Sequence, residues 1–149
     1  MKKIMATKSS AFSLIELLVV IAIIGILSAT GVITYQGYIS GTKKKATENA
    51  MQQIALAQTE EFSNTGDYYY TSTDTDTCSP TNDSSQAINA NLFEGGEIIA
   101  DKSGYYVCTV QLGTSYIVVA EEIKSAAAKG DACVMSMTAN SVWTRNKNC

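Results

Sequence analysis

The chain of 149 residues contains no histidine and only one proline, Pro80. Without histidine it cannot build the imidazole-based acid and base pairs of most hydrolases, or a zinc site of the cysteine–histidine type. Motifs for an activated serine or for a phosphate-binding glycine loop are also missing. We therefore expect neither an enzyme nor a bound cofactor or metal. Because proline is absent before residue 80, no proline breaks a helix in the first half.

Charged residues make up only 17% of the chain, and they are unevenly placed. The first eleven residues hold Lys2, Lys3 and Lys8 but no acid. The rest of the chain has eight bases and fourteen acids, a formal charge of −6. This balance disfavours a nucleic-acid partner. Arg145 and Lys147 leave a local basic patch open, but nucleic acid is not indicated.

An apolar run from Phe12 to Ile33 contains a single charged residue, Glu16. Its last 20 residues would form a helix of about 30 Å, which matches the hydrocarbon core of a bilayer. A carboxylate inside such a span costs about 2.5–3.5 kcal/mol at the centre, so it predicts a functional role with a partner. The small residues at 9–11 precede the run, whereas a conventional secretory signal places its cleavage site after the run. Cleavage after Ala11 would therefore leave the spanning segment on the mature chain.

The segment AFSLIE followed by LLVVIAIIGIL resembles the class III leader and N-terminal helix of type IVa-like pilins, the N-methylphenylalanine pilin family. The likeness is close over about residues 8–45. It implies that prepilin peptidase cleaves after Ala11 and methylates the new amine of Phe12. It also implies that Glu16 pairs with that amine on a neighbouring subunit. Ala11 stands where the family usually has glycine, and Ile33 stands where it commonly has proline.

In place of that proline the helix contains Gly25 and Gly31, each about 1 kcal/mol less favourable than alanine in a helix interior. We expect the helix to loosen between these two glycines when it leaves lipid and packs into a filament. A second pair, Gly37 and Gly41, could instead form a close-packing face, although one such match is a weak signal.

The stretch from Thr34 to Ser63 has no proline, and small or apolar residues recur at helical spacing at Ala46, Ala50, Ile54 and Ala57. It predicts one helix over about residues 12–64 whose second half is amphipathic. The lysines at 43–45 are expected on a solvated face of this helix. Residues 64–67 supply stop and turn signals.

The C-terminal half predicts an antiparallel meander of three to four strands, on which the second half of the long helix packs. This is an α+β fold. A polar loop over residues 68–85 and a short helix over 86–93 should precede the sheet. The strand candidates are 98–100 or 105–110, then 115–123, 132–138 and 141–145. The expected core residues are Tyr106, Val110, Ile117, Val119 and Trp143.

All four cysteines follow the apolar run. Their even number in a small domain beyond a membrane signal predicts two disulfides formed in an oxidising compartment. Three pairings are open, and the order along the chain favours Cys78–Cys108 with Cys133–Cys149. The second bond would close a loop of about 17 residues and stabilise the fold by about 3 kcal/mol. A C-terminal loop of this kind resembles the one in pilins.

We therefore expect a leader at residues 1–11, a transmembrane or filament-core helix at 12–41 and a disulfide-bonded head at 42–149. The resemblance implies a type IV pilus subunit that begins as a single-pass precursor in the inner membrane. It would meet the assembly machinery there and polymerise with copies of itself into an extracellular fibre for adhesion, motility or DNA uptake. The alternatives are a pseudopilin of a type II secretion machine, or a low-copy minor pilin that captures DNA or a surface.

Overall fold

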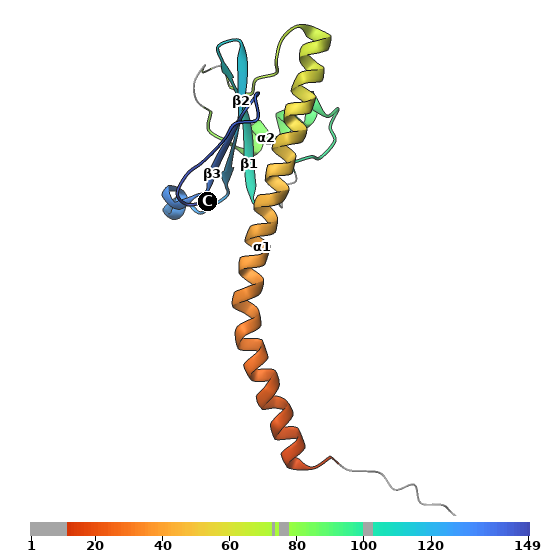
Figure 1. Ribbon diagram of the computed structural model, residues 1–149, viewed down its shortest axis with the longest axis vertical. Helices are drawn as coiled ribbons and strands as arrows, with labels where there is room; N and C mark the ends of the chain where they lie inside the picture. The colour runs from red at the N-terminus through yellow and green to blue at the C-terminus, as the bar shows by residue number, and fades with distance from the viewer. Residues whose placement is uncertain (1–11, 73, 75–77, 100–102) are drawn as a thin grey trace, which may run out of the picture. The chain divides into compact units, whose positions relative to one another are not determined.

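The computed structural model describes residues 12–72, 74, 78–99 and 103–149. The chain forms two compact units, Met1–Ser40 and Gly41–Cys149, and the second is called the head below. Helix α1, Leu14–Thr65, runs through both units (Figure 1). A long helix followed by an antiparallel sheet confirms the α+β prediction.

Within the head, α1 presents one face to the protein interior. The residues buried on this face are Thr47, Glu48, Ala50, Met51, Ile54 and Gln58. The three- and four-residue spacing of this stripe is that of an amphipathic helix. The prediction was correct for Ala50 and Ile54, but Ala46 is exposed. After Thr65 the chain turns at Gly66, which has φ +87° and donates its N–H to the Phe62 carbonyl at 2.9 Å, as the stop signals predicted.

The sheet has four antiparallel strands in the order β1-β2-β3-β4, the predicted meander. The strands are β1 Tyr105–Leu112, β2 Ser115–Glu122, β3 Val134–Thr138 and β4 Trp143–Arg145. Of the two alternatives for the first strand, the one that begins near residue 105 is right, because Ile98 and Ile99 lie in a bend. A short 3-10 helix, Ala126–Asp131, connects β2 to β3.

The core lies between the head part of α1 and one face of this sheet. It contains Met51, Ile54, Ile88, Ile99, Tyr105, Val107, Tyr116, Val118, Ala120, Cys133, Met135 and Met137. Val110 is buried as expected, although it lies on the opposite face of the sheet from this cluster, and Trp143 packs against the cluster as expected.

Tyr106, Ile117 and Val119 were wrong as core residues, because they lie half-buried on the opposite face of the sheet. Residues 116–120 are apolar on both faces, so their alternation could not say which face turns inward. A shift of one residue in a strand exchanges the two faces completely.

Helix α2, Asn82–Leu92, matches the short helix predicted over residues 86–93 but begins four residues earlier, so its first turn lies in the stretch expected to be a loop. Thr81 caps it: its hydroxyl accepts from the Ser84 N–H at 3.1 Å, and the Ser84 hydroxyl accepts from the Thr81 N–H at 2.9 Å. This reciprocal capping box normally uses glutamate or glutamine in place of Ser84, which hid the helix start in the sequence.

Side chains from outside the sheet occupy the free edge of β1. The Ser85 hydroxyl accepts from the Val107 N–H at 2.9 Å, and the Ser84 hydroxyl donates to the Val107 carbonyl at 2.7 Å. Further along, the Thr109 N–H donates to the Thr71 hydroxyl at 2.9 Å and the Thr71 N–H donates to the Thr109 carbonyl at 3.0 Å. The backbone groups that an edge strand leaves open are thereby satisfied.

Gln58 is a fully buried polar residue on α1 that holds the segment after the helix. Its amide nitrogen donates to the Tyr69 carbonyl at 2.6 Å, and its amide oxygen accepts from the Tyr69 N–H at 2.8 Å. The side chain therefore binds the backbone of Tyr69 as a neighbouring strand would.

Replacing Gln58 with alanine should lower the free energy of unfolding by about 1–3 kcal/mol, because the Tyr69 N–H is left buried without a partner. Urea unfolding of the full chain in detergent, followed by circular dichroism, measures this change. Gln53→Ala on the exposed face of the same helix is the control and should change stability by less than about 0.5 kcal/mol. Equal effects of the two substitutions would contradict the role given to Gln58.

Candidate assembly and processing site

The start of α1 lies next to the predicted cleavage site. Phe12 is 88% exposed, Ser13 precedes the first helical residue, and Ala11 lies outside the described residues. The Glu16 carboxylate reaches back and accepts the Ser13 N–H at Oε2, at 2.8 Å. This contact is one half of a capping box, and it places a negative charge at the positive end of the helix dipole. Oε1 makes no described contact and can accept a further donor.

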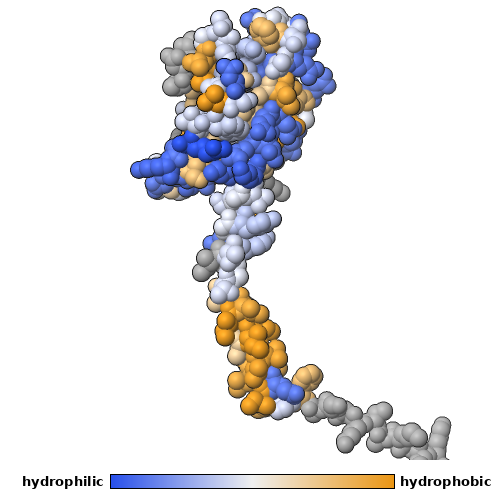
Figure 2. Space-filling view, viewed as in Figure 1, coloured by the Kyte–Doolittle hydropathy of each residue, from blue (hydrophilic) through white to orange (hydrophobic). Residues whose placement is uncertain are grey.

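The first part of α1 is apolar on every side, and its side chains are exposed (Figure 2). The exposed large apolar residues of this part are Phe12, Leu14, Ile15, Leu17, Leu18, Val19, Val20, Ile21, Ile23, Ile24, Ile26, Leu27 and Val32. Removing each of them from water is worth about 1.5–3 kcal/mol, so together they require lipid or other protein around them. By length and composition, α1 is the one helix in the described part of the chain that could cross a membrane.

Two threonine hydroxyls within and just after this apolar part donate hydrogen bonds to carbonyls of the helix itself. The Thr30 hydroxyl donates to the Leu27 carbonyl at 3.2 Å, and the Thr34 hydroxyl donates to the Thr30 carbonyl at 3.0 Å. Back-bonding of this kind hides the hydroxyls from an apolar environment. Apart from these polar groups, Glu16 is the only acidic or basic residue among residues 12–42.

Gly25 and Gly31 lie in continuous helix, and a Cβ added to either glycine would meet nothing within 4 Å. Packing inside the single chain therefore gives no reason for glycine at these positions. The missing side chains leave room for a second helix to approach closely.

Of the lysines at 43–45, Lys43 and Lys45 are exposed as expected and Lys44 is half-buried, but each also makes a contact within the head. The aliphatic chain of Lys43 lies against Gly104, whose φ is +81° and where an added Cβ would come within 3.0 Å of Lys43 Cδ. Lys44 Nζ donates to the Cys149 carbonyl at 2.8 Å. Lys45 Nζ lies 2.7 Å from Glu48 Oε2. Long amphipathic side chains can cover apolar surface while the charged ends remain near water.

Glu48 is at the centre of this contact between α1 and the sheet. Its side chain is 10% exposed, and its second oxygen, Oε1, accepts from Arg145 Nη2 at 3.0 Å. The Arg145 guanidinium also lies 5.2 Å from the centroid of the Trp143 ring. Burial alone would raise the pKa of the Glu48 carboxyl, but hydrogen bonds and positive charge from Lys45 and Arg145 outweigh burial and lower that pKa.

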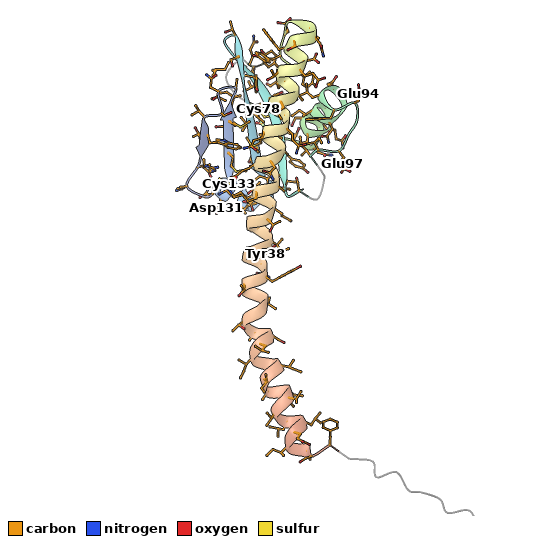
Figure 3. All side chains as sticks on the ribbon, turned by 45° about the vertical axis from the view of Figure 1, so that its right-hand side comes forward. Tyr38, Cys78, Glu94, Glu97, Asp131 and Cys133 are labelled. Carbon is orange, nitrogen blue, oxygen red and sulfur yellow. A yellow bond between two sulfur atoms is a disulfide. The ribbon has the colours of Figure 1, made fainter. Side chains whose placement is uncertain are left out.

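Two disulfides tie the remaining segments to the sheet. Cys78 bonds to Cys108 in β1, and Cys133 bonds to Cys149, with S–S distances of 1.98 and 2.11 Å (Figure 3 labels Cys78 and Cys133). The described cysteines therefore leave none free. Because Cys149 also accepts from Lys44, the second bond connects the end of the chain to α1.

Asn146 organises the loop that the Cys133–Cys149 bond closes. Its amide oxygen accepts from the Val134 N–H at 3.2 Å, and its amide nitrogen donates to the Ala132 carbonyl at 2.8 Å. Sequence reasoning missed this residue, and also Ser13, Glu48 and Gln58. The signal available for Glu48 and Gln58 was their place beside or within the helical stripe of α1. For Ser13 it was the Ser-x-x-Glu pattern of a capping box, which Ser13 and Glu16 form before the apolar run. Asn146 had no comparable signal.

Glu48→Gln should make the fold less stable at pH 7 by about 1–2 kcal/mol, since two partly exposed ion pairs are weakened. The lowered pKa of Glu48 means that its contribution is complete above the pKa of the unfolded carboxyl, about 4.3, and is lost as the pH falls through the still lower pKa of the folded state. The stability difference between the two proteins should therefore shrink between about pH 5 and pH 3.

Urea unfolding at pH 7, 5 and 3 measures this difference. Glu97→Gln removes an exposed carboxylate without an ion-pair partner among the described residues, so its effect should be small and should not change with pH. A difference between the unmodified chain and Glu48→Gln that stays constant from pH 7 to pH 3 would disprove the role of the ion pairs.

Comparison with known families gives one match, to the prokaryotic N-terminal methylation motif, over residues 6–32. This motif is of the structural, pilin type and does not belong to an enzyme family. No curated protein matches the chain, and no solved structure does. The matched residues end within the apolar part of α1, ahead of the helix and four-stranded sheet of the head. The chain therefore carries the class III leader motif of type IV pilins at residues 6–32, on an α+β architecture consistent with the pilin fold, and this motif supports a pilin- or pseudopilin-like protein.

Proposed function

We propose that this chain is a structural subunit of a type IV pilus that polymerises through α1 after its leader is removed. The observation that carries the proposal is an apolar helix surface that no other described residue covers, within the segment that the methylation motif matches. In a filament, neighbouring copies of the same helix would replace lipid around this surface. Each helix would then exchange one apolar environment for another.

In this proposal the leader is residues 1–11, the filament-core helix is about residues 12–41 and the head follows. Prepilin peptidase would cleave after Ala11 and methylate the amine of Phe12. The precursor would cross the inner membrane once, with its head on the oxidising side where the two disulfides form. The assembled fibre would then be extracellular.

Glu16 would select the neighbour in the filament. Ser13 occupies only Oε2 of the Glu16 carboxylate, so Oε1 can accept the Phe12 ammonium of another copy while the helix cap stays intact. Two opposite charges that meet in an apolar surrounding remove much of each other's desolvation penalty. Because Glu16 is the only ionised side chain in this segment, the pair would fix the axial register of one helix against the next.

Gly25 and Gly31 would allow the helix to adapt when it moves from lipid into the filament. The helix is continuous through both residues in the single chain, and we propose that it loosens between them on entry into the filament. Glycine lowers the free energy needed to open helix hydrogen bonds there, at about 1 kcal/mol per residue relative to alanine. A filament map with unbroken helical density from Phe12 to Thr42 would contradict this part of the proposal.

Mass spectrometry of sheared surface fibres tests the proposed function directly. The dominant species should begin at methylated Phe12, lack Met1–Ala11 and be lighter by four hydrogens for two disulfides. Intact Met1 on assembled material would contradict the processing step. Fibres that persist unchanged after deletion of the gene would point instead to a pseudopilin or to a minor subunit.

Substitutions of Glu16 test the pairing separately from the helix cap. Glu16→Gln keeps an oxygen that can accept from the Ser13 N–H but removes the charge, while Glu16→Ala removes both. Both variants should still insert in the membrane and should yield at least tenfold fewer fibres, because a charge-assisted bond of about 1.5–3 kcal/mol is lost for each subunit. Normal fibres from Glu16→Gln would show that the cap, and not the charge, is what matters.

A further inference from the structure

The described basic side chains of the head gather at one end, where Glu48, Glu121 and Glu122 also lie. The strand ends at Tyr105, Glu122, Val134 and Arg145 meet at one end of the sheet, because each is paired to its neighbour there. This end, which we call the lysine end, also receives α1 at residues 43–45. It holds all the basic side chains that the structure describes in the head: Lys43, Lys44, Lys45, Lys124, Arg145 and Lys147.

Most of these bases are already engaged within the head. Lys44 binds the Cys149 carbonyl, Lys45 and Arg145 bind Glu48, and Lys124 binds Glu122 at 3.3 Å. Lys147 differs, because it is exposed and makes no ion pair or hydrogen bond through its side chain with any described residue. It lies in the C-terminal loop that the Cys133–Cys149 disulfide and Asn146 hold in place. The loop thus presents one free ammonium on a fixed backbone.

The opposite end of the head carries unpaired acids. Glu60 and Glu61 lie about 24 Å further along α1 than Lys44, at 1.5 Å per residue. Together with Glu94, which follows α2, they surround a surface hollow of about 350 Å³. The other described residues that line it are Ala57, Asn64, Asn91, Leu92 and Phe93, so none is basic. We call this hollow the carboxylate hollow, and Figure 3 shows Glu94 and Cys133 toward opposite ends of the head.

The three carboxylates of the hollow have no counter-charge among the described residues. No ion pair or side-chain hydrogen bond joins any of them to another described residue. Three like charges around one hollow repel one another, and a cation placed among them relieves that repulsion. The charged head of a lysine, flanked by the amides of Asn64 and Asn91, is of suitable size and chemistry for this position.

We propose that the carboxylate hollow of one copy receives Lys147 from the lysine end of a second copy. The two surfaces lie at different ends of the same head, so the contact is heterologous and can be repeated by every copy added. Such a contact does not close into a symmetric dimer, and it continues from copy to copy in the helical filament formed by α1. The proposal rests on the proposed function, since it describes how heads would meet in the filament formed by α1.

A second copy explains both surfaces, whereas an anionic membrane surface explains only one. Negatively charged lipid would attract the lysine end. It would leave Glu60, Glu61 and Glu94 without a partner at the far end of the head. Because most bases at the lysine end are internally paired, the exposed ammonium of Lys147 fits a discrete pocket better than a diffuse charged plane.

Zero-length cross-linking of purified fibres tests this contact. A carbodiimide joins a carboxylate to an amine in direct contact, forming an amide with the loss of one water. Fibres grown from an equal mixture of 14N- and 15N-labelled subunits should yield mixed-isotope peptides that link Lys147 to Glu60, Glu61 or Glu94. Mixed-isotope peptides show that the bond joins two copies. Fibres that form normally but give no such link from Lys147 would overturn the contact, whereas failure of the unmodified chain to form fibres would overturn the proposed function itself.

Charge exchange provides an independent readout. Lys147→Glu and Glu61→Lys should each lower the yield of fibres by about fivefold or more, and the two changes in one chain should restore most of the yield. Glu97→Lys is the matched control, because it makes the same charge change at an exposed residue outside the hollow. Equal losses from Glu61→Lys and Glu97→Lys would reduce the effect to net charge and overturn the proposal. Normal fibres from Lys147→Glu, together with weaker binding to vesicles containing anionic lipid, would assign Lys147 to the membrane surface instead.

Discussion

The apolar half of α1 imposes the constraint on which the rest of the structure depends. Its side chains face outward on every side and none is buried, so this segment can only exist in lipid or among other apolar helices. The head cannot relieve that requirement, because its own core is already filled by the second half of the same helix. The first half of α1 therefore requires an apolar environment outside its own chain, whereas the second half is packed in the core of the head. The transition between them falls within a few turns, between Val32 and the first buried residue, Thr47.

Charged side chains mark the transition from the apolar part of α1 to the part that packs in the head. Three lysines follow the apolar part, and each is attached to the head by packing, by a carbonyl or by an ion pair with Glu48. Arg145 reaches the same carboxylate from β4, so the start of the buried stripe on α1 is bound to the last strand of the sheet. The disulfide at Cys149 extends this attachment to the end of the chain. Mechanical load on α1 would consequently reach the sheet through several parallel contacts.

The sequence predicted the long helix, the meander and the membrane segment because each has a periodic or compositional signal longer than ten residues. The sequence-based prediction was wrong or incomplete where a single residue determines the local structure. Both faces of β2 are apolar between Tyr116 and Ala120, so the inward face was chosen wrongly. The start of α2 depends on a serine in a capping role, and the segment after α1 depends on the buried amide of Gln58. At the N-terminal site Glu16 was recognisable as a lone charge, but its bond to the Ser13 N–H required coordinates.

The covered edge of β1 has a consequence for how copies of this chain can join. An open strand edge is a template on which further strands add without limit, and this is the route to cross-β aggregates. Here Ser84, Ser85 and Thr71 occupy the edge of β1, and the other outer strand, β4, is only three residues long. Uncontrolled growth of the sheet is therefore disfavoured, even at the high local concentration of the proposed fibre. In that proposal copies join through α1, and the sheet of each head has no long open edge on which another copy could add a strand.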